Sequence, residues 1–402
     1  VGIGAFVVGA ALFAAGVARL GRAAQVSAAW IVALCVLAIT AGDAIMHLTN
    51  GLETSLAMAA ATWALAFDLE DREGARWVVP VLCGLMPFLR PELSLLSLLL
   101  LTRRALARRT TEARHQRRLA LRDLALAGAV ALPWIAAQWI MGGTPVPSTI
   151  GVKRVFFAEF CQHPMRRALT VLLGVVRFSA RVGPVALGIA LASRRRGTLV
   201  GAIFASGFLL AYWAFLPGGL QHNTFRYAYL LLPVALAALA GALGASGRVR
   251  AAARGVIAVG IAYNLLTAPA HLAERRERLR FARVELRGVS QWCRANLPAR
   301  SVLLAHDIGY LSLTTPFAIV DLVGLKTPGS ASIHRAVTGE TCGVGRGAAV
   351  ARIARASHAT HFVVLRAWDN LFHFTDQLRA AGVPLRLVRD AAEGYQVYAL
   401  SP

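Results

Sequence analysis

Long runs of apolar residues alternate with short polar or arginine-rich segments over the first two thirds of the chain. A helix that crosses the hydrocarbon core of a bilayer needs about 20 mainly apolar residues, and fewer where two short helices pair. The pattern therefore predicts about ten membrane-embedded helices. The expected ranges are 1–20, 27–45, 54–67, 77–89, 92–102, 124–141, 168–192, 198–216, 227–245 and 255–270.

The stretch 77–102 differs from the other apolar runs because two charged residues, Arg90 and Glu92, flank Pro91 at its centre. Proline interrupts a helix, and charged side chains at membrane depth have to reach water or a polar cavity. We therefore expect two short helices joined as a hairpin, with the charged tip at the outer membrane face.

Arginines gather in three clusters, at 103–122, 194–196 and 248–254. Cytoplasmic loops carry an excess of Lys and Arg, so the clusters are placed in the cytoplasm. Alternation then puts the whole of 271–402 outside, together with the loops 43–53, 142–167 and 217–226. It also puts Val1 outside, and we expect an earlier membrane helix upstream of it, because no translocation signal is visible.

The composition agrees with a membrane protein, since 57% of the residues are hydrophobic and only 16% are charged. The formal net charge of +23 would suit a nucleic-acid partner if the arginines formed one basic face on a soluble domain. They are instead distributed over short loops, so nucleic-acid binding is excluded and membrane lipids are the expected surroundings.

The periodicity changes near Glu285 to short strands that alternate with helices. The predicted strands are 301–306, 317–320, 361–365, 385–389 and 395–400, and the predicted helices are 286–296 and 371–381. The expected fold class is a polytopic α-helical membrane domain over 1–270, followed by an extracytoplasmic soluble α/β domain over 271–402.

The five cysteines do not form a metal-binding spacing. Cys35 and Cys83 lie inside apolar runs and are expected to pack as small hydrophobes. Cys161, Cys293 and Cys342 fall on the outer side, where two of them are available for a disulfide, and the sequence does not decide which two.

Two groups of polar residues on the outer side are candidates for substrate binding. Asn50 and Glu53 precede a helix, where the carboxylate either orients a sugar hydroxyl or caps free backbone N–H groups. Arg90 has a donor fork suited to a lipid phosphate, and Glu92 is next to it. The structural alternative is an Arg90–Glu92 ion pair that only allows the hairpin to turn.

Two further outer loops carry cations. Lys153 lies in the Gly- and Pro-rich loop 142–154, which is either part of a binding site or a turn near anionic lipid head groups. His222 and Arg226 open the helix after the next outer loop, where such residues are also common as interfacial anchors. Their shared side of the membrane is the reason for grouping these candidates.

In the soluble domain, His306 and Asp307 follow one predicted strand and Asp321 closes the next. Residues just beyond the carboxyl ends of strands bind ligands in many α/β sheets. The alternative is that these residues form turns and helix caps.

Several motifs together resemble a known family. They are NGLETS at 50–55, FLRPELSLL at 88–96, GGTPVPSTIGVKR at 142–154, FRYAYLLLP at 225–233, HDIGYLS at 306–312 and VDLVGL at 320–325. The combination resembles bacterial GT-C glycosyltransferases, polytopic enzymes that use polyprenyl-phosphate sugars. The nearest branch includes terminal arabinofuranosyltransferases of the mycobacterial cell wall and mannosyltransferase-like proteins.

The resemblance implies an inverting sugar transfer at the outer face of the inner (plasma) membrane, from a polyprenyl-phosphate donor to a cell-envelope glycan, lipid or protein. Arg90, with Lys153 or Arg226, would stabilise the leaving phosphate. The general base in this family usually lies in the first outer loop, which by the topology above precedes Val1; Asp43 and Glu53 are the less favoured alternatives. A divalent cation assists some members.

Two other function classes compete with a transferase. A transporter or flippase of a lipid-linked saccharide predicts charges near the bilayer midplane and repeated helix arrangements, and the sequence shows no clear repeat. A non-catalytic cell-envelope assembly protein would bind glycan through the outer domain alone.

Overall fold

The computed structural model describes residues 2–49, 53–70, 76–107, 113–142, 149–192, 199–391 and 394–400. The chain divides into two compact units. The first, called the helical unit here, comprises Val1–Pro147 and Pro164–Leu272. The second, called the sheet unit, comprises Ser148–His163 and Ala273–Pro402.

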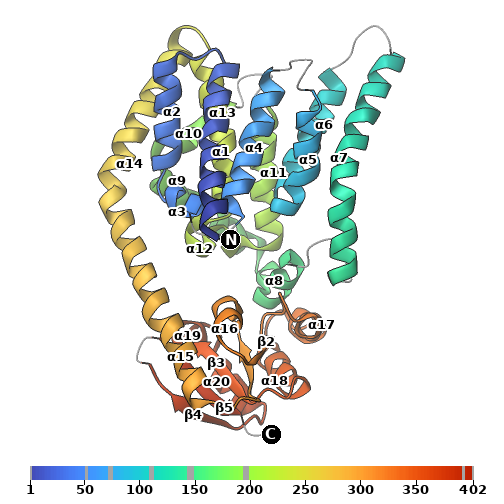
Figure 1. Ribbon diagram of the computed structural model, residues 1–402, viewed down its shortest axis with the longest axis vertical. Helices are drawn as coiled ribbons and strands as arrows, with labels where there is room; N and C mark the ends of the chain where they lie inside the picture. Colours follow the sequence, from blue (N-terminus) through green and yellow to red (C-terminus); the bar gives the residue numbers. More distant parts are fainter. Residues whose placement is uncertain are drawn as a thin grey trace. The chain divides into compact units, whose positions relative to one another are not determined.

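Helices occupy the apolar runs of the helical unit, as the sequence predicts (Figure 1). They are α1 (Gly2–Ala23), α2 (Ala28–Thr40), α3 (Ala44–Thr49), α4 (Thr54–Glu70), α5 (Val78–Leu89), α6 (Leu93–Ala107), α7 (Ala113–Gly142), α9 (Pro164–Val182), α10 (Leu187–Ala192), α11 (Leu199–Phe215), α12 (His222–Phe225), α13 (Leu232–Leu243) and α14 (Gly247–Phe281), the last of which continues into the sheet unit.

Three helices among the described residues are long and apolar enough to cross a membrane: Arg117–Met141, Pro164–Ile189 and Gly247–Asn296. A fourth results if Pro217–Phe225 and Ala228–Leu243, which are bent by 92° relative to each other, are counted as one broken span. Shorter apolar helices include Val78–Leu89, the first arm of the expected hairpin. The length and composition of these helices agree with a membrane environment.

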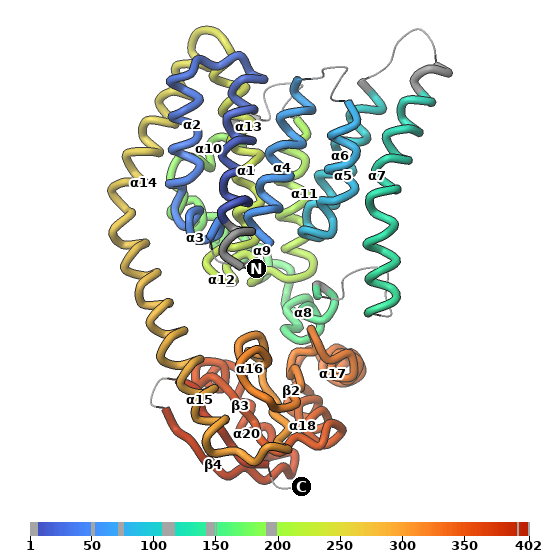
Figure 2. The backbone as a smooth tube through the Cα atoms, viewed as in Figure 1, coloured from blue at the N-terminus to red at the C-terminus, as the bar shows by residue number. Residues whose placement is uncertain are grey.

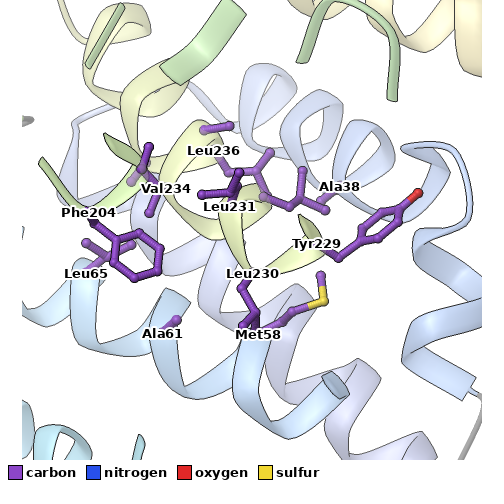
Figure 3. Packing of buried hydrophobic residues seen from close by; sticks show 14 of the residues in the cluster. Ala38, Met58, Ala61, Leu65, Phe204, Tyr229, Leu230, Leu231, Val234 and Leu236 are labelled. Atoms are coloured by element: carbon purple, nitrogen blue, oxygen red, sulfur yellow. The ribbon is translucent and has the colours of Figure 1, made fainter. Parts of the chain in front are cut away.

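Helix α13 is the centre of the helical unit, and nearly all of its side chains are buried. Its residues pack with apolar side chains from α2, α4 and α11 (Figure 3). Small residues allow the close approach, because a Cβ atom at Gly188 of α10 would lie 2.7 Å from the carbonyl oxygen of Ala235. Close packing at small residues is typical of helices that associate inside a membrane.

The segment 77–102 folds as the predicted pair of short helices. α5 ends at Leu89 and α6 begins at Leu93, with an extended Arg90 between them (φ −154°, ψ 123°). The backbone N–H of Leu93 donates to the carbonyl of Arg90 at 3.0 Å, which closes the turn around Pro91. The expected pair of helices with a turn at Pro91 is confirmed, and the location of this turn at the outer membrane face stays a prediction.

The first arginine cluster differs from the expected solvated loop. Arg103 and Arg104 lie in the last turns of α6 and form ion pairs with Asp68 (2.6 Å) and Asp123 (3.1 Å). The Arg104 and Asp123 side chains are only 5% and 4% exposed. Arg103 and Arg104 therefore connect α6 to α4 and α7, because each guanidinium group pairs with a carboxylate on one of these helices.

Helix α9 corrects the expectation of one crossing over 168–192. Trp213, near the end of α11, donates to the carbonyl of Pro164 at 3.2 Å, and Arg177 donates to Gln221 at 2.6 Å. At the other end of α9, Arg181 pairs with Asp43, just beyond α2. Both ends of a helix about 28 Å long therefore contact the end of the bundle where α2 and α11 finish. The helix runs across that end, and the chain then turns at Gly183.

The sheet unit contains five strands in the order β2-β1-β3-β5-β4. The strands are β1 (Val302–Ala305), β2 (Ala318–Asp321), β3 (His361–Leu365), β4 (Leu385–Arg389) and β5 (Tyr395–Leu400). Strand β1 is parallel to β2 and β3, whereas β5 is antiparallel to β3 and β4. All five predicted strands are confirmed, because their short β-branched and aromatic runs are bounded by turns.

Helices cover the sheet, and two separate apolar clusters contain residues from alternate positions of its strands. The helices are α8 (Thr149–Phe157), α15 (Arg287–Asn296), α16 (Ile308–Thr314), α17 (Pro328–His334), α18 (Arg346–Ala356), α19 (Arg366–Phe372) and α20 (Phe374–Ala380). The predicted helix 286–296 is confirmed. The predicted helix 371–381 is divided at His373, which adopts a left-handed conformation (φ +52°).

The segment around α8 belongs to the sheet unit, although the sequence analysis assigns it to a loop of the membrane domain. Phe156 is fully buried in the apolar cluster of the sheet unit, and its carbonyl accepts a hydrogen bond from Arg346 at 2.8 Å. Cys161 and Cys342 form a disulfide, whereas Cys293 is a buried free thiol. The smooth trace of Figure 2 shows α8 beside α17, far from it in sequence.

We predict that peptide mapping of the oxidised full-length protein will find Cys161 linked to Cys342. Replacing both cysteines by serine should lower the free energy of unfolding of the sheet unit by about 2–5 kcal/mol, because the loop 161–342 is then no longer closed. Thermal unfolding measures the loss. Cys293→Ser is the control that should keep the crosslink, and a crosslinked peptide containing Cys293 would contradict the assignment.

Candidate functional site

Three segments that are distant in sequence meet at the carboxylate of Glu53. The Nη2 atom of Arg226 lies 2.7 Å from Glu53 Oε1, and the Nε atom of Arg90 lies 3.1 Å from the same oxygen. Glu53 directly precedes α4, Arg90 is at the hairpin tip, and Arg226 follows α12. The structure therefore brings together three of the residues that the sequence analysis proposes.

Arg90 is held from several directions and is only 3% exposed. Its Nη2 donates to the hydroxyl of Thr54 at 2.9 Å, and its guanidinium lies 4.8 Å from the centre of the Tyr227 ring. Such a cation–π contact strengthens when the cation is desolvated. The Glu53 side chain remains 39% exposed, so the cluster is accessible at the carboxylate.

Glu92 does not pair with its neighbour Arg90 as the alternative interpretation expects. Its Oε1 accepts a hydrogen bond from the hydroxyl of Tyr212 at 2.9 Å. Its Oε2 is buried without a hydrogen-bond partner among the described residues. Tyr212 lies near Tyr227, against which His222 also stacks at 6.2 Å. The hairpin tip thus contributes a cation to Glu53 and a carboxylate to Tyr212.

The backbone before Arg226 is strained. Asn223, Thr224 and Phe225 have φ values of +48°, +59° and +61°, which residues other than glycine rarely adopt. The ring of His47, which is 1% exposed, donates from Nε2 to the carbonyl of Thr224 at 3.0 Å. Strained backbone persists where its surroundings enforce it, and such segments occur frequently at functional sites.

A second polar group surrounds Asp43, which is 5% exposed. Its carboxylate lies 2.5 Å from Arg181 and 3.3 Å from Nδ1 of His271. Its backbone N–H donates to the hydroxyl of Tyr229, which in turn donates to the carbonyl of Ala41. The sequence alone does not predict these partners of Asp43, although Arg181 is noticeable as a charged residue inside an apolar run.

The surroundings of Glu53 affect its protonation. Burial by itself would raise the pKa of the carboxyl, but the guanidinium groups of Arg90 and Arg226 outweigh burial and hold the pKa below its ordinary value. Glu53 is therefore ionised at neutral pH, and the three side chains carry one net positive charge. This excess charge makes the cluster a candidate anion site.

The contacts around Glu53 leave two other proposed residues untested. Asn50 lies outside the described residues. Lys153 is part of α8 in the sheet unit. Its expected role beside the donor phosphate stays a prediction.

The candidates in the sheet unit separate into two kinds. The carboxylate of Asp321 accepts hydrogen bonds from the backbone N–H groups of Val323 and Lys326, at 2.9 and 2.8 Å, so this buried residue closes a turn. Asp307 instead is half exposed and accepts a hydrogen bond from Tyr395 at 2.5 Å. His306 stacks on Trp368 at 4.3 Å, and burial lowers the pKa of His306 to about 4.

Comparison with known protein families finds one match, confined to the C-terminal part of the chain. A family described as "Domain of unknown function (DUF8728)" matches residues 272–398. No curated protein matches the chain significantly. The match covers the sheet unit apart from its α8 segment and residues 399–402, and it carries no functional description.

We predict that the stability of the sheet unit depends on pH through His306. Between pH 6.5 and about 4 the unfolded chain binds a proton that the folded domain excludes, so the free energy of unfolding decreases as the pH falls through this window. The decrease should be about 2 kcal/mol at pH 5.

Thermal unfolding of the full-length protein at pH 7 and pH 5 measures this effect. His306→Phe keeps an aromatic ring beside Trp368 but cannot titrate, so it should lose less stability on acidification than the wild type. Equal losses in the two proteins would show that His306 is not the titrating group.

Proposed function

We propose that the protein is a membrane-embedded glycosyltransferase that moves a sugar from a polyprenyl-phosphate donor to a glycan, lipid or protein acceptor of the cell envelope. The observation that supports it most is the convergence of Arg90 and Arg226 on one oxygen of Glu53. Two guanidinium groups against one carboxylate leave a positive charge for a phosphate. The motif resemblance supplies the chemistry of donor and acceptor.

In the proposed reaction the acceptor hydroxyl attacks the anomeric carbon of the sugar, and the bond from that carbon to the lipid phosphate breaks with inversion. The proton of the hydroxyl goes to a carboxylate base, and the departing phosphate keeps the electron pair of the broken bond. Arg90 and Arg226 would stabilise the charge that develops on the phosphate oxygens. Glu53 is accessible beside them and would orient a sugar hydroxyl.

Neither carboxylate considered within the chain suits the role of general base. Asp43 is paired with Arg181 and His271, and Glu53 with Arg90 and Arg226. The two guanidinium groups lower the pKa of Glu53 and weaken it as a proton acceptor, and the carboxylate of Asp43 is already occupied by its own partners. We therefore assign binding and orientation to Glu53 and leave the base unassigned.

The proposed location is the plasma membrane, with several helices of the helical unit embedded in it and the sheet unit on the outer side. The apolar helices support the first part. The disulfide between Cys161 and Cys342 supports the second, because disulfides persist mainly in oxidising compartments. It also joins the α8 segment to the rest of the sheet unit, so both parts of this unit would lie on the same side of the membrane.

We predict that Arg90→Ala will reduce sugar transfer by at least about a hundredfold, because a charged hydrogen-bond donor to the departing phosphate is lost. The assay uses membranes containing the full-length protein and a panel of polyprenyl-phosphate donors with radiolabelled sugars. Arg90→Lys should retain part of the activity, since it keeps the charge without the donor fork.

Arg122→Ala is the matched control, because Arg122 lies in α7 and its side chain is 46% exposed. It should leave transfer unchanged. Activity of Arg90→Ala equal to that of this control would remove Arg90 from the mechanism. Movement of intact lipid-linked saccharide across vesicles without sugar turnover would favour a transporter instead.

A further inference from the structure

Helix α9 has two apolar faces, and only one of them packs against the rest of the helical unit. The buried residues of the helix are Val171, Gly174, Phe178 and Val182. They recur every three or four positions, so they lie on one face. A Cβ atom at Gly174 would lie 3.4 Å from the Cβ atom of Leu220, which follows α11, so this face is in close contact with the end of the bundle.

The other apolar face of α9 is exposed, and we call it the apolar stripe. It consists of Met165, Leu169, Leu172, Leu173 and Val176, whose side chains are 42% to 71% exposed. Helical geometry puts these residues opposite the buried face, in a line about 17 Å long. Single exposed apolar side chains are ordinary, whereas a continuous exposed stripe marks a surface for an apolar partner.

Two exposed arginines border the apolar stripe along one side. Arg166 and Arg177 are about three helical turns apart and therefore lie on the same flank of the helix. Arg177 donates to the neutral amide of Gln221, and neither guanidinium group has a carboxylate partner among the described residues. The chain contains no Asp or Glu between Glu159 and Glu274. This flank is therefore positively charged and suits an anionic partner.

The position of α9 in the helical unit favours lipid as the partner of both surfaces. Its two ends contact the end of the bundle, Pro164 through Trp213 and Arg181 through Asp43. The bundle contains helices apolar enough to cross a membrane, so hydrocarbon gives way to head groups near its end. Tryptophan is common at that depth, and Trp213 lies 4.7 Å beneath the guanidinium of Arg167.

A helix with an apolar face and a cationic flank is suited to this boundary. Its apolar side chains enter the acyl region of one leaflet, where they are removed from water. Its arginine side chains extend along the apolar surface and bring their guanidinium groups to the level of the phosphates. Both surfaces of α9 then contact parts of the same lipid molecules.

We propose that α9 lies in the membrane interface and binds anionic phospholipid. Acyl chains cover the apolar stripe, and Arg166 and Arg177 bind the phosphate groups of the same lipids. The site is separate from the Glu53 cluster. It does not depend on sugar transfer, because its ligands are phospholipids of the surrounding leaflet and not the donor of the proposed reaction.

A fluorescent label on the apolar stripe tests what covers it. Leu172→Cys is labelled with bimane in the full-length protein, in which Cys35→Ala removes the partly exposed free thiol. The labelled protein is placed in nanodiscs of phosphatidylcholine brominated in its acyl chains. The bromine atoms should quench this label, whereas iodide in the water should not. Arg352→Cys, at an exposed position of α18 in the sheet unit, is the control that should respond to iodide alone.

The same label measures the preference for anionic lipid. We compare quenching by brominated phosphatidylglycerol and brominated phosphatidylcholine at equal mole fractions, and expect phosphatidylglycerol to be enriched about fivefold or more beside Leu172. Arg166→Gln combined with Arg177→Gln should remove most of this enrichment. The corresponding pair of lysine substitutions should keep most of it, because the positive charges remain. Arg352→Gln is the control that should leave it unchanged.

Three results would overturn the proposal. Quenching of the Leu172 label by iodide alone would place the apolar stripe in water, and protection from both quenchers would place it against protein, such as a second copy of the chain. Equal enrichment of phosphatidylglycerol in the glutamine double variant and the wild type would remove the two arginines from the lipid site. A polyprenyl phosphate that displaces equimolar phosphatidylglycerol from the label would assign α9 to the donor lipid instead.

Discussion

The ion pairs of Glu53 with Arg90 and Arg226 hold three distant segments of the helical unit together. Arg90 is almost completely buried, and a buried guanidinium without a counter-charge is strongly destabilising, by about 3–5 kcal/mol when one partner is removed. The start of α4, the hairpin tip and the segment after α12 must therefore stay together. The left-handed residues 223–225 are tolerated because they deliver Arg226 to this point.

The same constraint is the basis of the proposed phosphate site. Because these three side chains carry two positive charges and one negative charge, one positive charge is left without a counter-charge among them. An anion that approaches Glu53 would meet two oriented guanidinium groups that need little reorganisation. Structural need and proposed function thus depend on the same residues, and substitutions there will affect both stability and activity.

The sheet unit has different requirements. Its stability comes from two apolar clusters and from the disulfide that closes the α8 segment onto it. At the end of β1, His306 is buried with neither ring nitrogen hydrogen-bonded among the described residues.

Local patterns along the sequence determined the elements themselves. Apolar runs located the helices, alternating runs located β3, β4 and β5 at their observed bounds, and Pro91 located the hairpin tip, because periodicity and backbone restriction act within a few residues. Grouping the outer polar loops also brought Glu53, Arg90 and Arg226 into one candidate site before their contacts were known.

Only the tertiary structure decided which partners meet. It paired Arg90 with Glu53 instead of Glu92, selected Cys161 for Cys342, laid α9 across the end of the bundle, and placed β1 between β2 and β3. It also buried the nitrogens of His306 beside Asp307 without a hydrogen-bond partner among the described residues. These outcomes depend on the distances between groups far apart in the chain, and on which of several compatible charges or thiols the packing brings within bonding distance.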